Sequence, residues 1–213
     1  MEKLIKSKVY WSLLIITLIG EFMFPHILSK FYNGYNYKTM TISELASTNS
    51  PVRVYYNSWL IWLGIFLCLT GVVFINLLKT KSKPLSITVG TLIITFAIGA
   101  GILAGLFSLN ENLDVVTTSS LIHIIGSSIG FIALLFVPLF LAILEFKSKN
   151  NLTGTIDVVF FILAFIFMVL FIMSDKAIFS GTIISYMGLW ERLTLASMYA
   201  PLFFYAVRQI KTL

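Results

Sequence analysis

Six long runs of apolar residues dominate the hydropathy pattern, and polar connections separate them. The runs cover about Val9–Phe24, Ser58–Leu78, Leu85–Leu109, Ser120–Phe146, Thr155–Ser174 and Glu191–Val207. Each is near the roughly 20 residues that an α-helix needs to cross a hydrocarbon layer of about 30 Å. The runs are continuous and do not alternate between apolar and polar positions, so they predict helices and not the strands of a barrel. We therefore expect an all-α, polytopic membrane protein, a six-transmembrane-helix bundle over residues 1–213 with a long outer loop over residues 25–57.

The composition agrees with this architecture. Of the 213 residues, 58% are hydrophobic and only 11% are charged, which leaves too little polar surface to cover a soluble domain. The formal net charge of +6 does not point to nucleic acid, because the basic residues lie in short tracts beside apolar runs, as topology signals do. Membrane lipid is the partner that this pattern predicts.

The basic residues also predict the orientation. Ten of them fall in the two termini and in alternate connections: Lys3, Lys6, Lys8, Lys79, Lys81, Lys83, Lys147, Lys149, Arg208 and Lys211. The connection at Asn110–Thr118 has no Lys or Arg. By the positive-inside rule we expect a cell-membrane protein with both termini cytoplasmic. Lys30, Lys38 and Arg53 in the first outer loop weaken this bias without reversing it.

The N-terminus allows two interpretations. A basic start followed by W-S-L-L-I-I-T-L-I-G resembles a secretory signal peptide. The residues that follow, Glu21–Pro25, offer no clear small-x-small cleavage site, so we favour a retained first helix. Cleavage, the alternative, leaves the other five helices oriented as before.

Small residues at four-residue spacing predict two helix-packing faces. They are Ala97, Gly101 and Gly105 in the third run, and Gly126 and Gly130 in the fourth. Two prolines, Pro138 and Pro201, interrupt the fourth and sixth runs, where we expect the helices to bend.

The stretch Ser119–Gly130 places a histidine, His123, within the fourth run. On a helical period it shares one face with small residues, namely Ser119, Gly126, Ser127 and Gly130. Because small residues allow another helix to come close, we expect His123 to point into protein and not into lipid.

A carboxylate is expected inside the outer leaflet, since Glu21 lies roughly 18 Å along the first helix. An ionised carboxylate at that depth costs up to about 3 kcal/mol, so Glu21 needs a partner, a proton or water, or else it snorkels to the surface. The aromatic residues that open the second run are typical of an interfacial belt with an anchoring role only: Tyr55, Tyr56, Trp59 and Trp62.

Two further motifs lie on the outer side. The sequence T-I-S-E at Thr41–Glu44 matches the capping box and predicts a short helix from about Ile42 to Ser47, in which Glu44 is either a cap only or part of a site. An arginine in the first turn of a helix is disfavoured by the helix dipole, so we expect Arg192 to have an acidic partner. The acids available on that side are Glu21, Glu44, Glu111, Asp114, Asp175 and Glu191.

These scarce polar residues share one leaflet, and we expect them to converge in an outward-facing pocket. The candidate ligand-binding residues are Glu21, Ser43, Glu44, His123, Glu191 and Arg192. We expect no metal and no cofactor, because His26, His123 and carboxylates make a poor ligand set for zinc. The single cysteine, Cys68, lies inside an apolar run, so no internal disulfide is possible.

Three of these segments resemble the family catalogued as domain of unknown function 998: T-I-S-E-L at Thr41–Leu45, His123, and G-L-W-E-R at Gly188–Arg192. The resemblance implies a mostly prokaryotic, six-helix membrane protein over nearly the whole chain, with a polar signature of Ser43, Glu44, His123, Glu191 and Arg192. Ala46 stands where many members have glycine, a departure that affects only the loop turn. The resemblance implies no reaction, substrate or protein partner.

Three functions remain open. The first is binding or translocation of a small amphiphile or lipid, with Arg192 holding an anionic group while Glu21 and His123 respond to protons. The second is a structural or accessory subunit of a membrane complex. The third is an intramembrane hydrolase with His123 as general base and Ser43 or a water as nucleophile. We favour the first function, and the sequence leaves open whether the protein is an enzyme.

Overall fold

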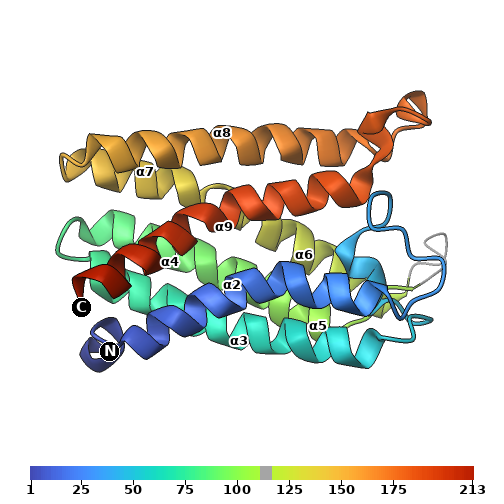
Figure 1. Cartoon of the computed structure of the whole chain (residues 1–213), viewed down its shortest axis with the longest axis horizontal. Coiled ribbons are helices and arrows are strands. Elements are labelled where there is room, and N and C mark those ends of the chain that lie inside the picture. The colour runs from blue at the N-terminus through green and yellow to red at the C-terminus, as the bar shows by residue number, and fades with distance from the viewer. Residues whose placement is uncertain (111–116) are drawn as a thin grey trace.

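The computed structural model describes residues 1–110 and 117–213, of which about 80% are helical and none form strands. The long helices run side by side along one axis, and the two termini lie at the same end (Figure 1). In chain order the elements are α1 (Glu2–Ile5), α2 (Lys8–Ser29), η1 (Ile42–Ala46), α3 (Arg53–Leu78), α4 (Lys83–Phe96), η2 (Ala97–Leu103), α5 (Ala104–Leu106), α6 (Thr118–Leu135), α7 (Val137–Lys147), α8 (Asn151–Met173), η3 (Ala177–Phe179), η4 (Ile183–Ser185) and α9 (Met187–Thr212).

Five segments of the described chain are long and apolar enough to cross a membrane: α2, α3, Lys83–Leu106, Thr118–Lys147 and α8. They support the predicted helical, multi-pass membrane protein. The sixth predicted helix is present as α9, which has 26 residues and packs along α2 and α8. It is not among the five, because Glu191, Arg192 and Arg208 interrupt its apolar character.

The proline predictions have different outcomes in the two helices. The fourth run divides at Phe136 into α6 and α7, with Pro138 in the first turn of α7, so the predicted interruption there is confirmed. The predicted interruption at Pro201 is wrong, since α9 continues through it to Thr212, and the bend expected there stays a prediction.

The third run is not one regular α-helix. Its centre, Ala97–Leu103, is a π-helix between α4 and α5. π-Helical turns are rare and often occur beside functional sites. Here the π-helix contacts both α3 and α6, which lie on either side of it.

Both glycine faces pack as predicted. A Cβ added to Gly101 would lie 2.6 Å from the Cα of Gly64 on α3, and one added to Gly130 would lie 3.0 Å from the backbone nitrogen of Ala100. Gly105 contacts α3 and Gly126 contacts the π-helix in the same way. The helices approach backbone to backbone at these glycines, which fixes the position of α6 beside the third run.

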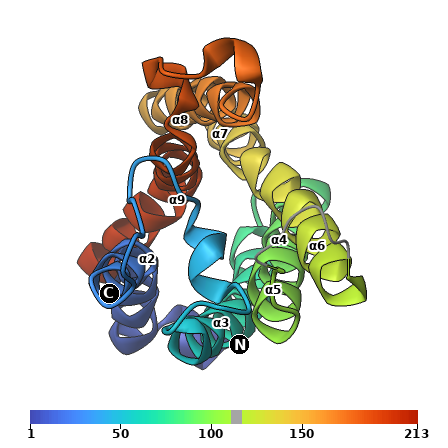
Figure 2. The same ribbon diagram turned by 90° about the vertical axis from the view of Figure 1, so that its right-hand side faces the viewer.

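The loop between α2 and α3 folds inward and fills the end of the bundle opposite the termini. Figure 2 shows it in the centre of the ring of helices, and we call residues Tyr35–Val52 the plug. Its short 3₁₀ helix η1 matches the predicted helix and carries the capping box, in which the Thr41 backbone N–H donates to Oε1 of Glu44 at 2.8 Å. Leu45 is fully buried, so the plug is part of the core.

At the opposite end, which holds the termini, a buried carboxylate joins three segments. Glu145 on α7 is 1% exposed and accepts hydrogen bonds from Lys81 Nζ at 3.2 Å and Asn150 Nδ2 at 2.9 Å. A guanidinium nitrogen of Arg208 lies 3.9 Å from the same carboxylate. This cluster connects the α3–α4 turn, α7 and α9.

Candidate functional site

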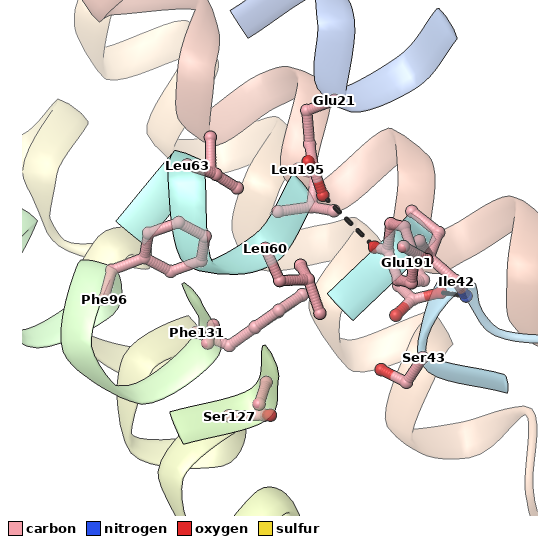
Figure 3. A pocket seen from close by; sticks show the side chains of 13 residues that line it. Glu21, Ile42, Ser43, Leu60, Leu63, Phe96, Ser127, Phe131, Glu191 and Leu195 are labelled. Atoms are coloured by element: carbon pink, nitrogen blue, oxygen red, sulfur yellow. Dashed lines mark hydrogen bonds between the residues drawn. The ribbon is translucent and has the colours of Figure 1, made fainter. Parts of the chain in front are cut away.

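A small chamber lies beneath the plug, between α2, α3, the third run, α6 and α9. Its volume of about 20 Å³ is enough for about one water molecule. Polar groups from five segments border it, while the other lining side chains are apolar (Figure 3). The polar lining residues are Glu21, Ser43, Tyr56, Ser127 and Glu191.

Glu21 enters the chamber from α2 and is 4% exposed. Its carboxylate accepts a hydrogen bond from Trp59 Nε1 at 2.5 Å and a longer one from the Tyr56 hydroxyl at 3.5 Å, both on α3. Glu21 therefore has protein partners and does not snorkel. The interpretation of Tyr56 and Trp59 as mere membrane anchors is wrong, because both donate to a buried carboxylate.

Glu191 borders the chamber from the first turns of α9 and is also 4% exposed. Its Oε2 accepts the backbone N–H of Ile42 in the plug at 2.6 Å (Figure 3). The chamber thus brings together two carboxylates from helices at opposite ends of the sequence.

His123 points into protein, as predicted, and is 2% exposed. Its Nδ1 lies 2.8 Å from the carbonyl oxygen of Phe107 and 3.1 Å from that of Ala104, so Nδ1 carries a proton and donates. The other ring nitrogen, Nε2, is buried and has no partner in the described part of the chain. One turn further along α6, the buried Oγ of Ser127 is also without a partner among those residues.

A larger, mostly apolar groove of about 370 Å³ runs between α6 and α8 beside the chamber. Its apolar wall consists of Leu109, Ile124, Phe131, Ile132, Met168, Phe171 and Ile172. His123 and Thr41 are among its polar lining residues. The groove shares Ser43, Ser127, Phe131 and Glu191 with the chamber, so the two cavities adjoin.

Arg192 is buried at 6% exposure but lines neither cavity. Its NH1 donates to the carbonyl oxygens of Gly188 at 2.7 Å, Tyr37 at 3.0 Å and Met40 at 3.2 Å, and its NH2 donates to the Tyr35 hydroxyl at 2.6 Å. The guanidinium also stacks on the Tyr37 ring at 3.7 Å. The expected acidic partner is not found among the described residues, where the guanidinium forms no ion pair.

The Tyr35 hydroxyl bridges Arg192 and the plug backbone. It accepts from the guanidinium and donates to the carbonyl oxygen of Thr41 at 2.8 Å. Burial raises the pKa of Tyr35 above its ordinary value, although the charge of Arg192 opposes this shift. The hydroxyl therefore stays protonated and keeps its donor role.

The six candidate residues separate into two groups. Glu21, Ser43, His123 and Glu191 line the adjoining cavities, whereas Glu44 and Arg192 hold the plug in place. Two of the outer acids considered as partners of Arg192, Glu111 and Asp114, lie outside the described residues. Within the described ranges no cluster of three His, Cys, Asp or Glu side chains could hold a metal ion.

Fold and site together define a multi-pass helical membrane protein with a buried, acidic chamber under an inserted loop. The chain belongs to the family described as Protein of unknown function (DUF998), whose model matches residues 16–208. Neither a curated protein nor a solved structure matches the chain.

Proposed function

We propose that this protein binds a small amphiphile at the outer end of its helical bundle. The apolar chain of the ligand lies in the groove between α6 and α8, and its polar head group reaches the chamber. The observation that carries this proposal is that an apolar groove of about 370 Å³ adjoins a chamber with two buried carboxylates. Ligand sites combine an apolar lining with a few convergent polar groups in this way.

The unpartnered atoms of α6 support the same assignment. Buried polar atoms are nearly always hydrogen-bonded, so an orphaned atom in a cavity wall indicates a missing partner. Nε2 of His123 and Oγ of Ser127 are such atoms, and both residues border the groove. A bound head group with hydroxyl or amine protons would satisfy them.

The orientation belongs to the proposal as well. We infer six crossings with both termini in the cytoplasm and the chamber near the outer surface of the cell membrane. At 1.5 Å per residue the 26 residues of α9 span about 39 Å, enough for a crossing. Both termini lie at one end of the bundle (Figure 1), together with ten of the fifteen basic residues.

Cysteine labelling tests this topology in a Cys68→Ser background. A membrane-impermeant maleimide applied to intact cells should label Thr182→Cys and leave Thr212→Cys unlabelled until the cells are opened. Labelling of both positions in intact cells would overturn the six-crossing topology.

Photolabelling tests the groove. The full chain in phosphatidylcholine nanodiscs is exposed to a photoactivatable long-chain alcohol, and the labelled peptides are mapped. Ile132→Trp should reduce labelling of α6 and α8, because Ile132 lines the groove. Ile129→Trp is the matched control, since Ile129 is on the same helix, is equally exposed (54% against 56%) and does not line the groove. Uniform labelling that Ile132→Trp does not change would contradict the proposal.

A second function has one specific observation in its favour. Nε2 of His123 is unpartnered and can act as a general base towards water during attack on an ester. Ser127 lies one turn away, but its hydroxyl does not hydrogen-bond to Nε2 and must move closer to serve as the nucleophile. Hydrolysis of fluorogenic acyl esters by the reconstituted protein, lost in His123→Gln, would establish this activity. Equal turnover by His123→Gln and the unsubstituted protein would exclude His123 as the general base.

A further inference from the structure

The charges around the chamber restrict what can bind there. The two carboxylic acids that line it are Glu21 and Glu191, and no lining residue is basic. Arg192 follows Glu191 in the chain, and its NH1 and NH2 groups donate to plug and helix oxygens, while its buried Nε has no partner among the described residues. Because Arg192 lines neither cavity, an anionic head group in the chamber would meet no cation among its described lining residues.

Three side chains along the path from groove to chamber offer acceptors only, and the hydroxyl groups beside them can accept as well as donate. Nδ1 of His123 donates to backbone carbonyls, which leaves the lone pair of Nε2 as an acceptor towards the groove. The carboxylates of Glu21 and Glu191 are acceptors when ionised. A complementary ligand therefore carries several donor protons.

The negative charges of two buried carboxylates beside one cavity also have to be neutralised. Like charges in a poorly solvated site are costly unless a proton or an opposite charge lies between them. Trp59 and Tyr56 supply neutral donors to Glu21, and the Ile42 amide supplies one to Glu191. The positive charge of Arg192 also acts on Glu191, but Arg192 does not line the chamber, and Glu21 has only neutral donors. A cation in the chamber would satisfy both carboxylates.

The size of the chamber selects among cations on lipid head groups. Its volume of about 20 Å³ admits one group of about the size of water. A primary ammonium group meets this limit and offers three donor protons, whereas a trimethylammonium group is several times larger and offers none. The adjoining groove provides the space for an attached alkyl chain.

We propose that the ligand is a long-chain primary amine, with its ammonium group between the carboxylates of Glu21 and Glu191 and its alkyl chain in the groove between α6 and α8. This inference rests on the proposed amphiphile-binding function. It identifies the head group, which that function left open.

Competition against the photoactivatable alcohol tests the inference with the full chain in phosphatidylcholine nanodiscs. The competitors are dodecylamine, dodecyltrimethylammonium, dodecanol and laurate, compared at equal membrane mole fraction. Dodecylamine should displace the probe at a concentration at least tenfold lower than any of the others. Equal competition by dodecanol, or stronger competition by laurate or dodecyltrimethylammonium, would overturn the inference.

Substitutions of the two chamber carboxylates test whether the preference for the amine arises in the chamber. In Glu21→Gln and in Glu191→Gln, dodecylamine should displace the probe at nearly the same concentration as dodecanol. The amide side chain keeps an acceptor oxygen but loses the negative charge. Asp175→Asn is the control, since Asp175 is an exposed outer acid away from both cavities. An unchanged amine preference in both glutamine variants would overturn the assignment.

The two proposals fail in different ways. If Ile132→Trp does not reduce labelling by the alcohol probe, the groove is not an amphiphile site and the proposed function fails. If Ile132→Trp reduces labelling but dodecylamine competes no better than dodecanol, the proposed function stands and only the head-group inference fails.

Discussion

The carboxylate of Glu191 accepts the backbone N–H of Ile42 at 2.6 Å, although 149 residues separate them in the chain. The next residue, Arg192, donates to the carbonyl oxygens of Tyr37 and Met40. The first turns of α9 therefore hold the plug through its backbone from two sides. Glu191 also borders the chamber, so the position of the plug and the shape of the chamber depend on each other.

Glu191→Ala should loosen the plug. Loss of the acceptor leaves the buried N–H of Ile42 unpaired, which costs about 1–3 kcal/mol. We expect amide hydrogen exchange across η1 to accelerate, measured by mass spectrometry in nanodiscs. Glu191→Gln keeps an acceptor oxygen and should exchange nearly as slowly as the unsubstituted protein. Faster exchange in the glutamine variant than in the alanine variant would show that the hydrogen bond does not hold the plug.

Arg192→Lys should destabilise the protein even though it conserves the charge. A single ammonium cannot reach the four acceptors that the planar guanidinium serves, and a loss of about 2–4 kcal/mol is expected. The thermal midpoint in detergent measures this effect. Arg53→Lys is the matched control, because Arg53 makes one side-chain hydrogen bond, to the Thr48 carbonyl oxygen. Similar shifts for the two variants would contradict the anchoring role of Arg192.

Gly99→Ala should disturb the contact between the π-helix and α6. The added Cβ would meet the carbonyl of Gly126, a backbone group that cannot rotate away. We expect a loss of about 1–3 kcal/mol from overpacking and a lower thermal midpoint. Thr91→Ala changes an exposed position of α4 in the same run and should leave the midpoint unchanged. An unaffected Gly99→Ala variant would mean that the two helices tolerate a wider spacing.

Glu145→Gln should weaken the end of the bundle that holds the termini. The carboxylate is buried, whereas Lys81 and Arg208 are about one third exposed, so water screens part of the interaction and about 1–3 kcal/mol is expected. Thermal unfolding of the full chain in detergent measures it. Glu2→Gln removes the exposed pair with Lys6 and should have no measurable effect. A stable Glu145→Gln protein would indicate that Asn150 alone holds the cluster.

Local patterns predicted much of the fold. The capping box of η1 depends on atoms three residues apart, and the two glycine faces follow from helical periodicity alone. The π-helix at Ala97–Leu103 had no such signal, because its residues fit an α-helix equally well. Its geometry accompanies close contacts with α3 and α6, which are distant in sequence.

The site was predicted only in part. Burial cost alone indicated that Glu21 needs a partner, but nothing in the sequence distinguished Trp59 as a donor from Trp59 as a membrane anchor. For Arg192 the sequence suggested an acid, while the observed acceptors are mostly backbone carbonyls. Every residue has a backbone carbonyl, so the sequence cannot show which residues will accept hydrogen bonds from Arg192.

Helix α8 forms one wall of the groove. It is the most apolar of the five spanning segments and has the smallest share of its residues buried inside the protein. In a bilayer, the faces of α8 that do not pack on α7 and α9 are then covered by acyl chains. Bilayer thickness and lateral pressure act directly on this helix and so on the width of the groove. The membrane is thereby a structural component of the cavity, and the lipid composition in which the protein is studied will change how well a ligand is held.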